Sequence, residues 1–215
     1  MPSLFSDAPL SLRGFLWARS LLTPYARIAA ALPTNGRILD LGSGHGLLSF
    51  ALVAGGPERR VIGIDHDAAR VKLAESAALR IPEASRPVFE SGDLRQKLES
   101  FESASLAGVA MIDILHYFDS GSQERLISEA SRVLVPGGVL AMREVDTDAG
   151  LPAVANRAYE RLATGVGFTR STNAKLTFRG ARQWKELLDD RGFLVSHERC
   201  GPPFFADVLF TGRRR

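Results

Sequence analysis

The stretch RILDLGSGHGLL, residues 37–48, decides the fold that this chain of 215 residues is expected to adopt. A short apolar run ends at an acid, Asp40, and Gly42, Gly44 and Gly46 follow at alternate positions. An apolar run, a glycine-rich turn and a second apolar run predict a buried strand, a tight turn and a helix. Ligands of doubly wound sheets bind at the carboxyl ends of the strands, and this first turn is the usual place.

The spacing of the glycines indicates which kind of ligand the turn binds. Dinucleotide-binding turns read G-x-G-x-x-G and bring a pyrophosphate to a helix N-terminus. Here the spacing is G-x-G-x-G, and the carboxylate of Asp40 would repel a pyrophosphate. A ligand with positive charge and no phosphate is favoured instead, and S-adenosylmethionine, with its ammonium and sulfonium groups, fits. The alternative is that Asp40 caps the helix and the glycines only form a tight turn.

Apolar runs typical of strands alternate with helix-like segments along the rest of the chain. Such alternation predicts an α/β fold with a largely parallel sheet. Pro24 is expected to interrupt the first helical segment. Strands are expected at 36–42, 59–65, 87–93, 107–118, 139–146, 193–200 and 206–213, and helices at 10–32, 46–55, 67–81, 122–138, 152–166 and 181–192.

Polar side chains recur where the successive strands end. Asp65 ends the second strand, where it could accept hydrogen bonds from a ribose diol, and Asp93 follows the third, where it could hold an adenine amino group. The fourth strand carries Asp113 and His116 at its carboxyl end. Singly, the acids can be turn residues or helix caps. Their joint order, one at each successive strand end, favours a nucleoside ligand.

Five stretches together resemble the class I S-adenosylmethionine-dependent methyltransferases, over roughly 37–215: ILDLGSGHG, VIGIDHD, SGDL, AMIDILHY and LVPGGVL. The resemblance implies a single domain, 1–215, with a Rossmann-like, doubly wound, seven-stranded sheet. That sheet is mostly parallel with an antiparallel last strand and helices on both faces. Within it we expect an N-terminal helical cap (1–34), a cofactor-binding core (35–146), a substrate-side helical cover (147–191) and the final two strands (192–215).

The resemblance also implies the residues that bind the cofactor, S-adenosylmethionine, without a metal. The fourth strand lacks the Asn-Pro-Pro-Tyr signature of members that methylate bases and amides. It reads IDILHY, which resembles small-molecule methyltransferases, so no nucleic-acid substrate is expected. The expected contacts are Asp40, Gly42, Ser43 and Gly44 with the methionine part, Asp65 with the ribose hydroxyls, His66 with the adenine ring, and Asp93 with Leu94 at the adenine edge.

Three side chains are candidate catalytic groups for an in-line methyl transfer, which we expect to be to oxygen. His116 is the first candidate base, because a neutral imidazole is available near pH 7. Asp113 is the second, and Glu144, at the end of the fifth strand, is the third. The alternative for each is a structural role. A carboxylic acid acceptor would need no base, and most of the rate gain is expected from positioning.

Substrate selection is expected to come from segments outside the strand ends. The segment 151–182 has six basic residues and one acid. It is either a solvated face or a cover that attracts an anionic substrate, such as a carboxylate, a phosphorylated molecule or an acyl group on a carrier protein. In the N-terminal helix, core packing is the default for four side chains, some of which could line an apolar pocket: Phe15, Trp17, Leu21 and Tyr25.

The composition of the chain limits the other classes of protein to which it could belong. One cysteine, Cys200, allows no intrachain disulfide and no cysteine cluster for a metal. No apolar run approaches the roughly 18 residues of a membrane span, and the N-terminus is a poor signal peptide, so a cytoplasmic protein is expected. Two alternatives to a methyltransferase are a non-catalytic protein that binds the cofactor and regulates a partner, and a nicotinamide-dependent oxidoreductase, which Asp40 and the glycine spacing disfavour.

Overall fold

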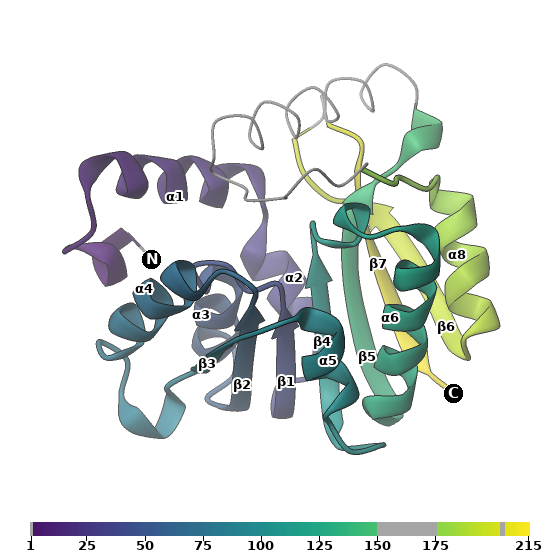
Figure 1. Ribbon diagram of the computed structural model, residues 1–215, viewed down its shortest axis with the longest axis horizontal. Coiled ribbons are helices and arrows are strands. Elements are labelled where there is room, and N and C mark those ends of the chain that lie inside the picture. Colours follow the sequence, from purple (N-terminus) through teal and green to yellow (C-terminus); the bar gives the residue numbers. More distant parts are fainter. Residues whose placement is uncertain (1, 150–175, 203–204) are drawn as a thin grey trace.

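Seven strands form one sheet in the order β3-β2-β1-β4-β5-β7-β6 (Figure 1). The computed structural model describes residues 2–149, 176–202 and 205–215. From β3 to β5 the neighbours pair in parallel, whereas β7 runs antiparallel to β5 and to β6, which confirms the predicted sheet. The strands are β1 (Asn35–Leu41), β2 (Glu58–Asp65), β3 (Val88–Ser91), β4 (Leu106–Ile112), β5 (Leu134–Val145), β6 (Phe193–Arg199) and β7 (Asp207–Arg214).

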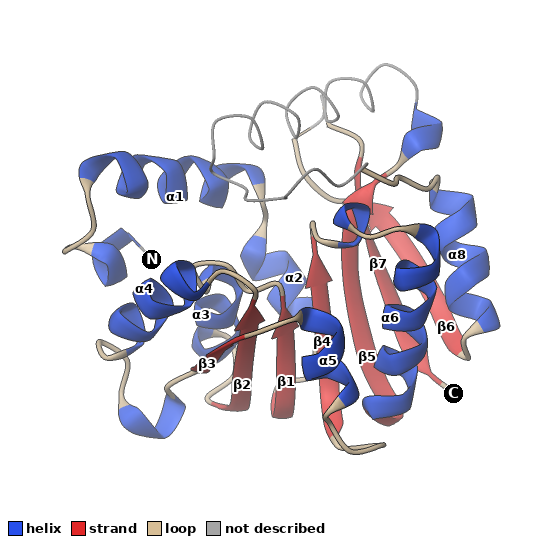
Figure 2. Ribbon diagram, in the orientation of Figure 1, coloured by secondary structure: helices blue, strands red, loops and turns tan. Residues whose placement is uncertain are grey.

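Helices cover both faces of the sheet (Figure 2). Side chains of a strand point alternately to the two faces, so Ile38 and Leu39 of β1 enter different cores. Ile38 packs in a cluster with Leu52 of α3, and Leu39 packs in a cluster with Leu126 of α6 and Trp184 of α8. The helices are α1 (Leu10–Leu22), α2 (Tyr25–Ala31), α3 (Leu47–Ala54), α4 (Ala68–Ala78), α5 (Leu94–Glu99), α6 (Ser120–Val133) and α8 (Ala181–Asp190).

Several element boundaries differ from the prediction: β5 begins at Leu134 instead of 139, and the short helix α5 was not predicted at all. The fourth strand stops at Ile112 instead of running to 118, because Asp113 adopts a left-handed φ of 57° that ends the extended backbone. The 3-10 turn η3 (Leu115–Tyr117) follows and carries His116. The predicted helix 122–138 also ends early, at Val133, because Pro136 and its preceding residue favour extended backbone. The predicted helix 152–166 lies outside the described residues.

The N-terminal segment forms two helices, with the predicted break at Pro24. Tyr25 is buried, and the Phe15 ring packs edge-on against His45 of the glycine turn. Trp17 and Leu21 are 57% and 63% exposed, so core packing was the wrong prediction for these two. In the described part of the chain, no helix is both long enough and apolar enough to cross a bilayer.

Candidate active site

The glycine turn is held tightly on one side and is open on the other. The backbone N–H groups of Gly42 and Ser43 donate to the carbonyl of Ile64, at 2.7 and 2.9 Å. A Cβ on Gly42 would lie 2.4 Å from the side chain of Ile114, so glycine is required there by packing as well as by its φ of 81°. A Cβ on Gly44 would meet nothing closer than Asp65 at 4.0 Å. The turn therefore leaves room for a ligand to approach the backbone at Gly44.

Asp40 is a buried carboxylate at the end of β1. It is 2% exposed, and its Oδ2 accepts a hydrogen bond of 2.6 Å from the hydroxyl of Ser49 in α3. Burial raises the pKa of Asp40 to about 6, with a smaller contribution from the nearby Asp65 and a partial offset by the Ser49 hydrogen bond. Asp40 also accepts a hydrogen bond from the backbone of Ser49, in the first turn of α3, so it has the helix-capping contact that was its alternative interpretation. A cation beside Asp40 would stabilise its charged form.

Asp65 ties the glycine turn to the end of β2. It is 4% exposed; Gly44 N–H donates to its Oδ2 at 2.8 Å, and Asp67 N–H donates to its Oδ1 at 2.9 Å. Nδ1 of His66, a half-exposed side chain, lies 3.4 Å from the same carboxylate. Asp65 thus has the role of a turn residue, which was the alternative to ribose binding. It also lies directly beside Gly44, where the ligand is expected.

Asp93 and Leu94 begin α5, after β3. Asp93 is the N-cap of that helix and accepts hydrogen bonds from the N–H groups of Arg95 and Gln96. The hydrogen bond from the Arg95 guanidinium, at 3.1 Å, is the main cause of the lowered pKa of Asp93. Leu94 is buried in the core. The structure therefore gives Asp93 a capping role, and its side chain is still about 38% exposed.

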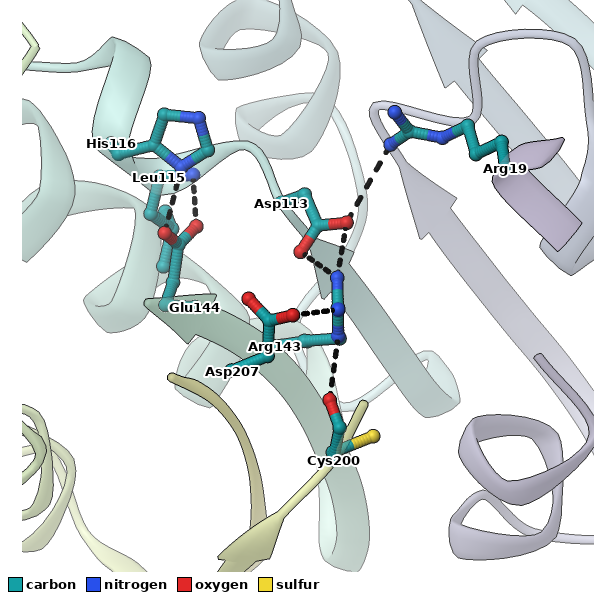
Figure 3. Close-up of polar contacts among 8 residues, drawn as sticks. All are labelled: Arg19, Asp113, Leu115, His116, Arg143, Glu144, Cys200 and Asp207. Atoms are coloured by element: carbon teal, nitrogen blue, oxygen red, sulfur yellow. Dashed lines mark hydrogen bonds and ion pairs between the residues drawn. The ribbon is translucent and has the colours of Figure 1, made fainter. Parts of the chain in front are cut away.

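His116 and Glu144 form a buried pair at the carboxyl ends of β4 and β5 (Figure 3). Nδ1 of His116 lies 2.8 Å from Oε2 of Glu144, and the other carboxylate oxygen accepts the N–H of Leu115 at 2.7 Å. The two side chains are only 2% and 1% exposed. The Phe178 ring stacks on the imidazole at 5.3 Å between centroids and 13° between planes. Glu144 therefore fixes both the turn η3 and the orientation of the imidazole.

Asp113, the second candidate base, belongs to a separate network (Figure 3). Both of its oxygens accept hydrogen bonds from Nη1 of Arg143, at 2.5 and 2.6 Å. Arg143 also pairs with Asp207 of β7 and donates to the carbonyl of Cys200 at 3.3 Å. Arg19 of α1 reaches Asp113 at 3.6 Å. The carboxylate of Asp113 is therefore engaged by two arginines.

Two residues of this region were missed by sequence reasoning. Arg143 is one of them, and a signal for it exists: an arginine and a glutamate stand side by side in a strand that is otherwise apolar, where unpaired charges are costly. Gln123 of α6 is the other. It is fully buried among backbone carbonyls beside His116. Nothing in the sequence around Gln123 indicated that its side chain would be buried and hydrogen-bonded there.

Two of the six bases of the segment 151–182 lie within the described residues. Arg179 donates to Gln123 and pairs with Glu124, and Arg182 pairs with Glu186 while its side chain is 86% exposed. The other four lie outside the described residues. Among the residues that the structure describes, no group of three or more histidines, cysteines or acids is placed to hold a metal.

Comparison with known proteins gives one family match. Residues 38–138 match the family model of a methyltransferase domain. A tRNA1(Val) (adenine(37)-N6)-methyltransferase of Porphyromonas gingivalis is 31% identical over 139 residues, covering 57% of this chain and 54% of that protein. The chain spans about half the length of the curated relatives that it matches.

Two solved structures illustrate the likeness in fold. The pyocyanin biosynthetic protein PhzM aligns with a TM-score of 0.72 at 18% identity, covering 99% of this chain and 61% of that one. An O-methyltransferase family protein from Burkholderia thailandensis aligns with a TM-score of 0.69 at 20% identity, covering 89% and 55%. At these identities the likeness shows the fold. That fold is the Rossmann-like fold of the methyltransferases it resembles, and within it residues 38–138 match a methyltransferase domain.

Proposed function

We propose that this protein transfers a methyl group from S-adenosylmethionine to a hydroxyl oxygen of a small molecule. The His116–Glu144 pair carries the proposal, because a hydroxyl nucleophile gains from a base and the pair lies at the carboxyl ends of adjacent strands. With Nδ1–H donated to the Glu144 carboxylate, Nε2 is the basic nitrogen of the imidazole.

The residues present fit the cofactor. S-adenosylmethionine supplies an electrophilic methyl group on a positively charged sulfur. The open face of Gly44 admits close approach of the methionine part, and the buried carboxylate of Asp40 favours its positive charge. Asp65, beside Gly44, is in place for the ribose hydroxyls. Ser43 lies in the same turn, and we propose His66, Asp93 and Leu94 for the adenine.

The chain's own groups then handle the proton. Nε2 of His116 takes the proton that the acceptor hydroxyl loses, and Glu144 stabilises the resulting imidazolium through Nδ1. Asp113 is held on both oxygens by Arg143, so we assign it a positioning role rather than that of the base. An anionic or carrier-bound acceptor is our finer proposal, resting on the net positive charge of 151–182.

A second candidate is methylation of a nucleic-acid base, because the relative from P. gingivalis is named as a tRNA adenine N6-methyltransferase. The residues at the end of β4 read IDILHY and lack the Asn-Pro-Pro-Tyr signature, which disfavours base methylation. A non-catalytic cofactor-binding protein is a third candidate, since intact cofactor residues alone do not require turnover.

Release of S-adenosylhomocysteine separates these candidates when the protein is assayed with hydroxylated aromatics, carboxylic acids, an acyl carrier protein bearing an acyl chain, and unmodified tRNA. We expect turnover with a hydroxyl-bearing small molecule. Turnover with tRNA alone would favour the second candidate. Cofactor binding without turnover on any acceptor would favour the third, and a response to NADH alone would indicate an oxidoreductase.

Replacement of Asp65 with alanine is expected to weaken binding of S-adenosylmethionine about tenfold or more. A hydrogen bond to a charged acceptor contributes roughly 1.5–3 kcal/mol, and the variant also removes the acceptor that holds the N–H of Gly44. Isothermal titration measures the affinity, and circular dichroism checks the fold. Asp67→Asn, which keeps a capping oxygen two residues away, is the matched control. Wild-type affinity in a folded Asp65→Ala variant would leave this residue only its turn role.

The affinity for S-adenosylmethionine is expected to fall as the pH drops below about 6. The raised pKa of Asp40, about 6, lies above its unfolded value, so the folded protein without cofactor gains stability at low pH from protonated Asp40. That contribution is complete below the unfolded value of 3.8 and is lost as the pH rises through 6. A bound cation favours the carboxylate, so binding near pH 6 should release a proton. Calorimetry in buffers of different ionisation enthalpy measures this release, which Asp40→Asn should abolish and Asp189→Asn, at a carboxylate of α8 that pairs with Arg215, should retain.

A further inference from the structure

One buried amide, that of Gln123 in α6, holds the turn that carries His116. Gln123 is fully buried. Its Nε2 lies 3.0 Å from the carbonyl oxygen of Leu115 and 3.2 Å from that of Phe118. These two carbonyls flank His116 on either side in sequence, so the amide spans the turn η3 from one end to the other.

The same amide holds a second segment of chain against that turn. Its Nε2 lies 2.8 Å from the carbonyl oxygen of Thr177, and its Oε1 accepts a hydrogen bond of 2.7 Å from Nε of Arg179. Arg179 is fixed in turn by Glu124 at 3.1 Å. Gln123 therefore connects η3 to residues 177–179 through one side chain.

The segment that Gln123 holds contacts His116 directly. The N–H of Thr177 donates to the carbonyl of His116 at 2.9 Å, and the ring of Phe178 stacks on the imidazole. The backbone of His116 and one face of its ring are thus set by residues 177 and 178, while its Nδ1 is set by Glu144. The hydrogen bond from Thr177 and the stacking of Phe178 both depend on the segment that Gln123 anchors. The contact with Glu144 does not.

The orientation of the Gln123 amide is uniquely determined. A carbonyl oxygen only accepts and a guanidinium only donates, so the three carbonyls require the amide NH₂ and Arg179 requires the amide oxygen. A rotation of the amide by 180° would place oxygen against three oxygens and NH₂ against a guanidinium. Arg179 therefore locks Gln123 in the orientation that holds η3.

We propose that Gln123 is a positioning residue for His116, with Arg179 as its orienting partner. This inference rests on the proposed role of His116 as the base. A glutamine that fixes both ends of η3 and the segment over the imidazole keeps Nε2 in one place relative to the acceptor, and a displacement of about 1 Å at a reacting group can cost roughly 100-fold in rate.

Two substitutions break the connection in different ways. Gln123→Glu is nearly isosteric and keeps an acceptor for Arg179, but sets a carboxylate oxygen against three carbonyls. Gln123→Met keeps the length and removes all the hydrogen bonds. Arg179→Met acts from outside the core, since the Arg179 side chain is 17% exposed, and releases the amide orientation without changing Gln123. Ser128→Ala on α6 is the control, because the hydroxyl of Ser128 donates a hydrogen bond of 2.9 Å to the backbone carbonyl of Glu124, one turn earlier in the same helix.

The first readout needs no acceptor. In the full chain with S-adenosylhomocysteine, proton NMR of ¹⁵N-histidine-labelled protein reports the Nδ1–H of His116, identified by its loss in His116→Asn. We expect this signal to shift or broaden in both Gln123 variants and less strongly in Arg179→Met. It should be unchanged in Ser128→Ala. Affinity for the cofactor should stay within about twofold of wild type, because none of these residues contacts the glycine turn in the structure.

The second readout is kinetic, with the acceptor found by the panel above. We expect kcat to fall roughly 10-fold to 100-fold in the Gln123 variants with a smaller change in KM, since the loss is in the placement of the base. A wild-type His116 signal in folded Gln123→Glu and Arg179→Met proteins would overturn the inference. Full activity of His116→Asn would instead overturn the proposed base while leaving the NMR result to stand on its own.

Discussion

Replacement of His116 with asparagine is expected to lower kcat for methyl transfer by about 10²- to 10⁴-fold, the usual contribution of a general base. Asparagine places an amide nitrogen near the position of the imidazole Nδ1, so it can still donate to Glu144, whose other oxygen holds the N–H of Leu115 at 2.7 Å. The variant thus removes Nε2 with little loss of the buried contacts. Affinity for S-adenosylmethionine should change little, and kinetics together with titration calorimetry measure the two effects separately.

Glu144→Gln tests the His116–Glu144 pair in a second way, because it changes which nitrogen of the His116 imidazole carries the proton. The N–H of Leu115 requires an acceptor, so the amide oxygen of the new glutamine must face it. The amide NH₂ then faces His116, where Nδ1 becomes an acceptor and the ring proton moves to Nε2. A ring protonated at Nε2 cannot take the acceptor's proton, so Glu144→Gln should lose activity comparably although its shape is unchanged.

Controls for the pair come from elsewhere in the chain. His197→Asn alters an exposed histidine of β6 that stacks on Phe210, and it should leave kcat unchanged. Retention of wild-type kcat by both His116→Asn and Glu144→Gln would show that the transfer proceeds without this base, as expected for a carboxylic acid acceptor. The pair would then have only a structural role at the ends of β4 and β5.

The alternation of strands and helices and the binding end of the sheet could be predicted because they depend on local patterns, whereas the seven-stranded sheet with its antiparallel last strand followed only from the family resemblance. Buried parallel strands read as continuous apolar runs, as in RILDL, and each is punctuated by glycine or an acid where it leaves the sheet. The same rule failed between 113 and 118. Ile114, Leu115 and Phe118 continue an apolar run, and only the left-handed backbone of Asp113 turns it into η3. Nothing local in the sequence required that conformation.

The positions of the candidate site residues could be predicted from the sequence, but their contacts could not. Asp40, Asp65 and His116 stand at strand ends, so their positions follow from the fold. Their partners do not, because Ser49, Gly44 and Glu144 lie between 9 and 28 residues away and meet them only in the folded sheet. The exposure of Trp17 was missed for the same reason: helical spacing predicts an apolar face and does not say what covers it.

Arg143 shows how a tertiary partnership can decide stability. It is 4% exposed and is paired with two carboxylates, Asp113 after β4 and Asp207 on β7. Burial works against its charge, yet Asp113 and Asp207 outweigh that cost and raise the pKa of the guanidinium. Because β5 lies between β4 and β7, this one side chain joins three strands at the end of the sheet where the site is built.

Arg143→Met is expected to destabilise the fold by about 3–5 kcal/mol, the usual cost of removing one partner from a buried ion pair. The loss arises because two buried carboxylates lose the guanidinium that pairs with both, and Asp113 keeps only the more distant Arg19, so the additional changes Asp113→Asn and Asp207→Asn should restore part of it. Denaturant unfolding monitored by circular dichroism measures the free energies. Arg182→Met, which breaks an exposed pair with Glu186, should change stability by less than about 1 kcal/mol. If Arg143→Met cost no more than that control, the two carboxylates would have found other partners or water. The arginine would then be dispensable to the end of the sheet that carries Glu144.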